Sequence, residues 1–354
     1  MPVQVKKKKL RLEFGMYDDA RVEGITMAEL AVRENKEVLA EIFEAAKLAG
    51  RVLDPIQVLL AARGLSKLSA VEDFYATNDD KTLFPEYINY LVRQPMTDAR
   101  RHILLSELVA NVVRLAATDE YKSLSIDWET EKKKLALKPI GEGAKFPTVT
   151  LATKEKSITI GKVGAKIKAT YETLRRRRVS QFAITLQGIN LKLAQDMVAL
   201  AIKVLVDGDG NSNAAAVVNS AGAIDYTKLS EWDIDAWDIY NPTVYVAKND
   251  MIKKVTGITE YKDPLLNKRA VDGSWPTPFG VNMKRFRGYT GILDDMLLGL
   301  DGSAALEQVE EAGASLVETQ KIIDGQFEEI VISKILGFAI IFPEARKIFK
   351  YTTS

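Results

Sequence analysis

The chain contains no cysteine and only one histidine, His102, among its 354 residues. Without cysteine there can be no disulfide, no thiolate metal site and no thiol nucleophile. A single histidine excludes metal sites built from several histidines, and an acid-base triad would have to use His102 itself. His102 stands between arginines and an apolar run, in the sequence ARRHILLSELV, which is typical of a partly exposed polar residue at the boundary of an element.

The chain also lacks a net charge of either sign and any long apolar run. Lys plus Arg number 49 and Asp plus Glu number 48, so the overall charge gives no attraction toward nucleic acid or membrane. No apolar run approaches the roughly 20 residues of a membrane span, and the first residues, MPVQVKKKKLRLEF, lack the apolar stretch of a signal peptide. We therefore expect a folded protein that is used in a cytoplasm and has no membrane partner.

The first third of the chain has the pattern of helices. At 354 residues the chain exceeds the size at which one core usually stops growing, so two or more lobes are expected. From Thr26 to Ala49 apolar residues recur at helical spacing, with Thr26 as N-cap. Asp54 and Pro55 predict the start of a shorter helix that ends at Gly64. Each helix has one apolar face, which must pack on the other helix or on something else.

The segment from Lys138 to Ala169 is dense in Thr, Val, Ile, Lys and Gly. Alternating runs at 148–151, 157–160 and 166–171 predict strands, and residues 154–156 occupy the turn of a hairpin. A hairpin with so few large apolar side chains cannot form a core alone, so it hangs in solvent or lies on another molecule. We favour the second alternative, because a long arm on its own would be costly to order.

A long helix is predicted from Ser180 to Val206, where apolar residues step by three or four. It ends at the sequence DGDGN, residues 207–211, which could bind a cation, cradle a phosphate or only turn the chain. The calcium pattern fails at loop positions six and twelve, the dinucleotide pattern lacks its third glycine, and no P-loop pattern occurs. What remains is the end of a helix, with a left-handed glycine and turn residues after it. We expect Gly208 as the left-handed residue, Gly208 and Gly210 as a hinge, and Asp207 and Asp209 as residues that cap and turn the chain without binding metal.

The remainder, from Ala214 onward, has the pattern of a mixed α/β lobe, so the whole chain is of the α+β class. PTVYVAKN predicts a strand, and a helix is expected from Asp250 to Thr256. The tract DGSWPTPFGVNMKRFRGY is rich in Gly, Pro and aromatic residues and predicts a long loop. Near the C-terminus, strands are expected at Ile330–Ile335, at Phe338–Phe342 and at the end of the chain.

Four segments, taken in order, resemble tailed-bacteriophage major capsid proteins, which have the Hong Kong 97-type fold. They are TLFPEYIN, the hairpin GEGAKFPTVTLATKEKSITI, YETLRRRRV leading into the helix that ends in VLVDGDGN, and ETQKIIDGQFEEIVISKILGFAIIFPEA. The resemblance covers roughly Phe74 to Ser354, a span of domain size. It rests on the order and spacing of the segments, since none of them is specific by itself.

The resemblance implies five parts in this chain. They are an N-terminal helical region that resembles a built-in scaffold, an N-terminal arm with the first strands, an extended β-hairpin loop that reaches a neighbouring subunit, a peripheral domain with a long spine helix, and an axial domain. Their expected bounds are 1–74, 75–137, 138–169, 170–213 together with 318–354, and 214–317, with the spine helix at 180–206.

The resemblance further implies a structural protein, not an enzyme, that self-assembles as hexamers and pentamers into an icosahedral shell. The shell would enclose the double-stranded DNA of a tailed phage or prophage, as part of a virion assembled in the host cytoplasm. No cofactor or metal is expected. A scaffolding protein, a portal and a maturation protease are candidate partners, and packaged DNA would be contacted without sequence specificity.

Three alternatives stay open. An encapsulin-type compartment has the same fold, but the long N-terminal region argues against it. A nucleotide- or metal-dependent enzyme built on the α/β lobe would need a convergent site, and the sequence shows none. A nucleic-acid-binding module would need a concentrated basic face, which the neutral charge balance does not suggest.

Contacts between subunits are expected in the extended loop and at four consecutive arginines before the spine helix. Arginine favours bidentate carboxylates at interfaces, so salt bridges between subunits come first, contact with interior DNA second and simple solvation third. The basic run at residues 6–11 either touches DNA or is a solvated tail. A covalent crosslink through an extended-loop lysine is not predicted, because no motif identifies its asparagine or assisting glutamate. The expected contact residues are Glu142, Lys145, Lys154, Glu155, Lys156, Arg175, Arg176, Arg177 and Arg178.

Overall fold

The computed structural model describes two units of the chain. The first takes residues 1–96, 162–193 and 311–335, and the second takes residues 97–161, 194–310 and 336–354. Within these units the described residues are 9–13, 15–23, 25–48, 53–66, 69, 73–74, 76–93, 102–115, 120–125, 152–170, 179–222, 224–237, 239–262, 278–288, 291–311, 316–322 and 327–352.

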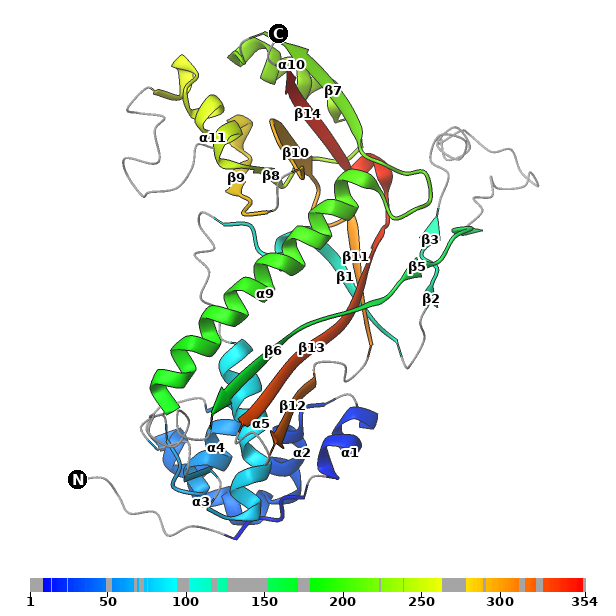
Figure 1. The fold of residues 1–354 in the computed structure, drawn as a ribbon. Helices are drawn as coiled ribbons and strands as arrows, with labels where there is room; N and C mark the ends of the chain where they lie inside the picture. The colour runs from blue at the N-terminus through cyan, green and yellow to red at the C-terminus, as the bar shows by residue number, and fades with distance from the viewer. Residues whose placement is uncertain are drawn as a thin grey trace. The chain divides into compact units, whose positions relative to one another are not determined.

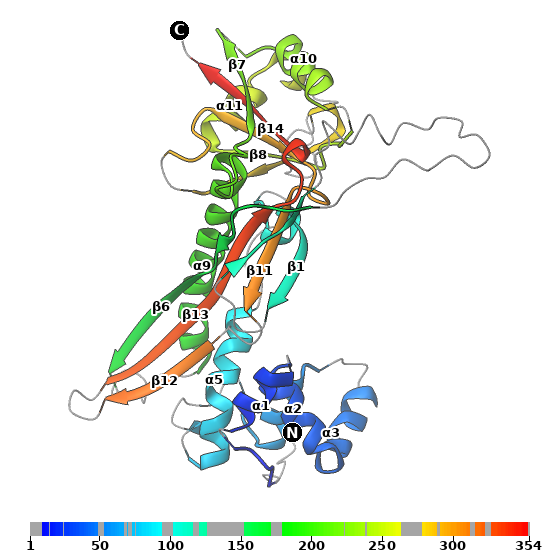
Figure 2. The same ribbon diagram turned by 90° about the vertical axis from the view of Figure 1, so that its right-hand side faces the viewer.

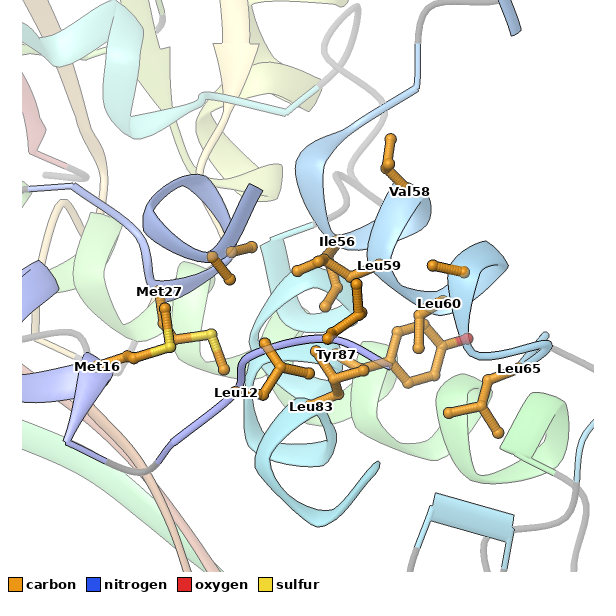
Figure 3. Close-up of a cluster of buried hydrophobic side chains, with 14 of the residues drawn as sticks. Leu12, Met16, Met27, Ile56, Val58, Leu59, Leu60, Leu65, Leu83 and Tyr87 are labelled. Atoms are coloured by element: carbon orange, nitrogen blue, oxygen red, sulfur yellow. The ribbon is translucent and has the colours of Figure 1, made fainter. Parts of the chain in front are cut away.

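In the first unit, five helices enclose one hydrophobic core (Figure 1). The helices are α1 (Met16–Glu23), α2 (Met27–Glu34), α3 (Lys36–Leu48), α4 (Pro55–Ala62) and α5 (Asn78–Arg93). Leu59, Leu83 and Tyr87 belong to this core, to which the side chains labelled in Figure 3 come from α1, α2, α4 and α5 and from the segments at Leu12 and Leu65. The core therefore continues past residue 74, where the sequence placed the end of the helical region.

The single helix predicted over Thr26–Ala49 is wrong, because the structure ends α2 at Glu34 and begins α3 at Lys36. Asn35 causes the break. Its side-chain amide donates to the carbonyls of Ala31 (2.8 Å) and Arg11 (3.1 Å), and its oxygen accepts from the Arg11 N–H (2.8 Å). An asparagine that bonds to backbone groups in this way competes with the helix ladder. The same side chain thereby holds the segment around Arg11 against the α2–α3 elbow.

The predicted helix starts are confirmed. The Thr26 hydroxyl accepts from the Glu29 N–H (3.2 Å), and the Glu29 carboxylate accepts from the Thr26 N–H (2.8 Å), which is a complete capping box. Asp54 is the N-cap of α4 and Pro55 follows at its first turn. Gly64 closes that helix with a left-handed φ of +69°.

The first unit also contains paired strands, which Figure 2 shows side by side. The N-terminal part of β13 (Phe327–Ile340) pairs antiparallel with β12 (Leu316–Ile322), with Leu316 opposite Ser333. It also pairs with β6 (Gly161–Thr170), which confirms the strand predicted around 166–171. Glu329, buried on β13, forms ion pairs with Lys166 and Lys168 of β6.

Two strands predicted at Ile330–Ile335 and Phe338–Phe342 are one strand in the structure. β13 runs without interruption through Gly337, which lies opposite Val309 of β11 (Leu306–Glu311). Glycine often marks the end of a strand, but here cross-strand pairing on both sides of it overrides that tendency. The first part of β13 thus belongs to the first unit and the last part to the second.

The long helix α9 (Val179–Asp207) confirms the helix predicted at Ser180–Val206 and is longer by one residue at each end. It contributes its first half to the first unit and its second half to the second. The buried residues of its second half are Val198, Ala199, Ala201, Ile202 and Leu205, and most of them recur at helical spacing on one face.

The second unit contains the predicted mixed α/β lobe. One sheet has the order β7-β14-β10-β8-β9, with β7 parallel to β14 and β8 parallel to β9. Its strands and the accompanying helices are β7 (Ala216–Ala221), α10 (Tyr226–Ala236), β8 (Val244–Ala247), α11 (Asn249–Thr256), η2 (Thr259–Lys262), η3 (Pro278–Gly280), β9 (Asn282–Arg285), β10 (Met296–Leu300), η4 (Pro343–Ala345) and β14 (Arg346–Thr352).

The core of this lobe is aromatic. Trp232 packs against Tyr245 and Phe349, with ring centroids 5.6 and 5.7 Å away. Gly299 of β10 faces these rings, and a Cβ there would lie 2.8 Å from Trp237 and 3.0 Å from Trp232. The long loop predicted at 272–289 is wrong at Asn282–Arg285, where β9 pairs with β8 at the sheet edge.

A further set of strands in the second unit has the order β1-β11-β13. The segment LSELVANVVRL forms the helical turn α6 (Leu105–Leu108) and then the strand β1 (Val109–Leu115). Glu307 of β11 accepts from Asn111 (3.0 Å) and from the Tyr121 hydroxyl (2.8 Å). Within the described part of the chain, no helix is long and apolar enough to cross a membrane.

Candidate functional site: the stem of the extended loop and its anchor

Residues 120–125, from the predicted N-terminal arm, and residues 152–160, from the predicted extended loop, form a stem of two short antiparallel ladders in the second unit. β2 (Glu120–Tyr121) pairs with β5 (Ile158–Thr159), and β3 (Leu124–Ser125) pairs with β4 (Ala152–Thr153). We call residues 120–125 and 152–160 the stem. The chain leaves it after Ser125 and returns at Ala152, and residues 126–151 lie outside the described residues.

The predicted hairpin turn at residues 154–156 is wrong in its pairing. These residues do separate two strands, β4 and β5, but each strand pairs with a segment that precedes the loop. A hairpin with this turn would pair the 157–160 run with residues just before the turn, whereas Ile158–Thr159 pairs with Glu120–Tyr121. The stem therefore joins the two ends of the loop, and residues 154–156 form a bend along one side of it.

The carboxylate of Asp209 fixes this bend to the rest of the unit. Its Oδ2 accepts from the Lys154 ammonium (3.0 Å) and from the Ile340 N–H (3.0 Å). Its Oδ1 accepts from the N–H (3.2 Å) and the side-chain amide (2.9 Å) of Asn211. The side chains of Lys154 and Asp209 are only 8% and 0% exposed. We call Lys154, Asp209, Asn211 and the Ile340 peptide the anchor.

Further hydrogen bonds connect the anchor with the stem. The Lys154 N–H donates to the Ser123 carbonyl (3.0 Å), across the stem, and its ammonium also donates to the Ile340 carbonyl. Asn211 pairs with the backbone of Lys156 in both directions, since its Oδ1 accepts from the Lys156 N–H (3.0 Å) and its Nδ2 donates to the Lys156 carbonyl (3.3 Å). The Asn211 side-chain amide thus makes with Lys156 the two backbone hydrogen bonds that a residue of a neighbouring strand would make.

The environment keeps Asp209 ionised. Burial by itself would raise the pKa of this carboxyl, but the hydrogen bonds from Ile340, Asn211 and Lys154, together with the charge of Lys154, outweigh it and lower the pKa to about 2. The anchor is therefore a charge-assisted set of bonds at neutral pH, and bonds to an ionised acceptor are stronger than those between neutral groups.

The DGDGN sequence gives the anchor its shape. Gly208 follows α9 with a left-handed φ of +93°, and its N–H donates to the Val204 carbonyl (2.9 Å), so the predicted C-terminal glycine is confirmed. A Cβ on Gly208 would lie 2.8 Å from the Asn213 Oδ1, which itself accepts from the Asp209 N–H (3.1 Å). Gly210 is also left-handed, with φ +93°. These turns aim the Asp209 carboxylate at Lys154 and Ile340.

A second buried cation holds the other end of this loop. Arg346 is fully buried, and its Nη2 donates to the Asn213 carbonyl. Burial lowers the pKa of Arg346 to about 10, against the opposing influence of Asp209 and Glu344, so it stays protonated at neutral pH. Within the described residues its Nε and Nη1 have no hydrogen-bond partner. Residues 208–213 are therefore held at both ends by buried positive groups.

The predicted site residues are only partly brought together. The Lys154 side chain is almost fully buried and has an intrachain partner, whereas Glu155 and Lys156 are exposed, and the expected contacts of these residues between subunits stay predictions. Glu142, Lys145 and Arg175–Arg178 lie outside the described residues. The role of Gly208 and Gly210 as a hinge stays a prediction. Among the described residues, no three His, Cys, Asp or Glu side chains gather in a way that could hold a metal ion.

The sequence missed the anchor itself. Asp209 was expected to turn the chain, and its bond to the Asn211 N–H does this. Its partners Lys154 and Ile340 lie 55 and 131 positions away, and no local pattern pairs them. The available signal was the run of Asp and Asn at alternating positions after a long helix, because such residues bond to backbone groups.

No protein-family model matches the sequence, and no curated protein matches it. The fold, in contrast, is similar to those of solved structures. A phage-related protein from Bordetella bronchiseptica RB50 has a TM-score of 0.52 at 10% identity, over 75% of this chain and 96% of its own. The capsid of the native GTA particle has a TM-score of 0.51 at 13% identity, over 73% and 95%.

A chain of Gordonia phage Cozz is similar in the same way, with a TM-score of 0.50 at 11% identity, over 74% of this chain and 90% of its own. Each likeness spans nearly the whole of the other chain. At these identities what is shared is the fold alone. The chain therefore has the α+β, Hong Kong 97-like fold of tailed-phage capsid proteins.

Proposed function

We propose that this protein is a major capsid protein, which self-assembles into the icosahedral shell around the double-stranded DNA of a tailed phage or prophage. The observation that carries the proposal is the anchored stem on a capsid fold. Short ladders join the two ends of a long polar loop, and a buried ion pair fixes the returning end to the rest of the second unit, so that the loop can reach beyond its own subunit.

The sequence between the ends of the stem supports this role. Residues 126–151 include the polar tract EKKKLALKPIGEGAKFP, which has too few large apolar groups to build a core of its own. Order would have to come from another molecule, and an identical neighbour is always available in a shell. A contact in which each copy reaches onto the next is heterologous, and such contacts close into rings when the rotation allows.

The partners and the finer organisation belong to the same proposal. Glu155 and Lys156, exposed beside the stem, and Arg175–Arg178 would contact neighbouring subunits within hexamers and pentamers. Residues 170–213 with 318–354 would be the peripheral domain and residues 214–317 the axial domain. A scaffolding protein, a portal and a maturation protease are the candidate assembly partners, and the interior face would contact DNA phosphates. The place of action would be the virion, assembled in the host cytoplasm, and the role is structural and not catalytic.

Expression of the chain alone tests the proposal. Sedimentation and electron microscopy should show closed particles of megadalton size. A monomer or dimer that carries a bound small molecule would refute it and favour an enzyme. Particles purified from the natural host should contain nuclease-protected double-stranded DNA, whereas particles filled with a cargo protein and free of nucleic acid would favour an encapsulin-type compartment.

A further inference from the structure

We propose that Asp209 is the positioning residue for the extended loop: its anchor sets the direction in which the loop leaves the subunit, and closed shells of one size require the anchor to be intact. The inference deepens the proposed function and rests on it. It assigns to one carboxylate a role in assembly that is distinct from its contribution to folding.

The Asp209 carboxylate joins three segments of the chain. Donors reach its carboxylate from the stem (Lys154), from the loop after α9 (Asn211) and from the last residue of β13 (Ile340). All three segments belong to the second unit. A single acceptor therefore fixes the stem to two elements that are themselves held by the helix and by the sheet.

The stem would be only marginally stable without the anchor. Each of its ladders pairs only two residues with two, and an isolated two-stranded ribbon is marginal even when it is much longer. Lys154 lies at the bend between β4 and β5, so the anchor acts where the two ladders meet. Because the displacement caused by a rotation grows with distance from its centre, a small rotation at this bend is amplified along the loop.

The contact between Lys154 and Asp209 is a buried charge pair and not an apolar contact. Burying two charges costs desolvation energy, and well-packed apolar side chains often stabilise a fold at least as well. What a charge pair adds here is direction, since four donors at 2.9–3.2 Å fix the carboxylate in one orientation. Arg346 and Asn213 hold the opposite end of the same loop, so that the acceptor itself cannot turn freely.

The test compares four changes in the full-length chain. Asp209→Asn removes the charge and keeps the shape, and Lys154→Met removes the cation. Asn211→Ala removes the pairing with Lys156 and the side-chain hydrogen bond to Asp209 but leaves the ion pair in place. Asp207→Asn is the matched control, because it removes the same charge two positions away, from an exposed residue at the end of α9.

Two measurements are made on each purified protein. Hydrogen exchange on unassembled subunits follows the amides of Lys154 and Lys156, which donate to Ser123 and Asn211. Electron microscopy and sedimentation after assembly give the fraction of closed shells and the spread of their diameters. Apart from these two measurements, a folding control, in which melting of the subunit is followed by circular dichroism, shows whether the fold survives.

We expect Asp209→Asn, Lys154→Met and Asn211→Ala to keep a folded subunit, to speed exchange at Lys156 by about tenfold or more, and to give open or heterogeneous assemblies. Asp207→Asn should match the wild type in both measurements. Closed shells of wild-type size from Asp209→Asn or Lys154→Met would overturn the inference, and so would wild-type protection of Lys156 in those variants.

If the single variants fail to fold, the double variant K154M/D209N, which leaves no unpaired charge, and Asn211→Ala carry the test with the same expected outcomes. A wild-type chain that forms no shells would overturn the proposed function and this inference together. Wild-type shells accompanied by unaltered variant shells would overturn this inference alone.

Discussion

Lys154 and Asp209, 55 positions apart in the sequence, form a buried ion pair with 3.0 Å between Nζ and Oδ2. The pair joins the stem of the extended loop to the turn that follows the long helix α9.

Asp209→Ala should lower the free energy of unfolding of the second unit by about 3–5 kcal/mol, because it leaves the Lys154 ammonium buried without its carboxylate. The double variant K154M/D209N should lose less than Asp209→Ala alone. All four tryptophans fall in the residue ranges of the second unit, so urea unfolding followed by tryptophan fluorescence reports on it. A double variant that is less stable than the single one would contradict the pairing.

The anchor should weaken in acid. The pKa of Asp209 is about 2 in the folded protein, below its ordinary value of 3.8, so its contribution to stability is fully present above pH 4. That contribution is lost as the pH falls from about 4 toward 2, because the unfolded state then binds the proton more readily. The difference in stability between the wild type and Asp209→Asn should be constant from pH 5 to 7, at about its full value, and shrink below pH 4. A difference that stays constant down to pH 2 would show that the carboxylate is not the cause.

Removing residues 1–74 should make the remaining chain insoluble. The cut would separate α5, with Leu83, Phe84 and Tyr87, from the helices α2 and α4 that cover these side chains. Light scattering and the soluble fraction after expression measure the effect. Supplying residues 1–74 as a separate chain should restore solubility, whereas a soluble, monodisperse truncated subunit would contradict the shared core.

Three glycine-to-alanine variants should differ in a fixed order. Gly208→Ala should cost the most, because Gly208 has a positive φ and its new Cβ would meet Asn213. Gly210→Ala should cost about 1–2 kcal/mol for the left-handed backbone alone, since the space around it is open. Gly188→Ala, in the open middle of α9, should stabilise the protein by about 0.5–1 kcal/mol. Thermal unfolding of the three proteins checks the order, and equal effects at 208 and 188 would contradict it.

Neutralising Arg176 and Arg177 together, as the R176Q/R177Q variant, should impair assembly and leave the subunit folded. Arginine at an interface favours carboxylates of the partner, which it binds through two parallel hydrogen bonds. Sedimentation of the assembled material and circular dichroism of the subunit separate the two effects. Lys36→Gln, in the exposed part of α3, serves as a control for loss of a positive charge. Normal yields of closed shells from the variant would count against a role in subunit contacts.

Local features of the fold could be predicted from the sequence, and distant pairings could not. The stepped apolar residues of α9, the Thr26 cap and the left-handed Gly208 each depend on neighbours a few positions away, and all three are confirmed. The break in the helix at Asn35 was not predicted, because the Asn35 side chain bonds to Arg11, which lies 24 positions away in the sequence. The uninterrupted course of β13 through Gly337 depends in the same way on β11 and β12.

In the candidate site, too, local features could be predicted and distant pairings could not. The turn residues of DGDGN could be predicted, since glycine and aspartate are the residues that such turns need. That Asp209 accepts from Lys154 and Ile340 could not, because the ion pair forms only after the stem and the end of β13 meet. Asp209, one of the carboxylates that suggested a metal loop, instead accepts hydrogen bonds from the Lys154 ammonium and from peptide N–H groups.

The uninterrupted strand β13 also limits how the gene can change length. Side chains alternate along its 14 residues, and Ser333 pairs with β12 while Leu336 pairs with β11. A codon inserted between these two positions would turn every following side chain over to the opposite face. Insertions and deletions among relatives should therefore accumulate in the connecting loops and be absent from this strand.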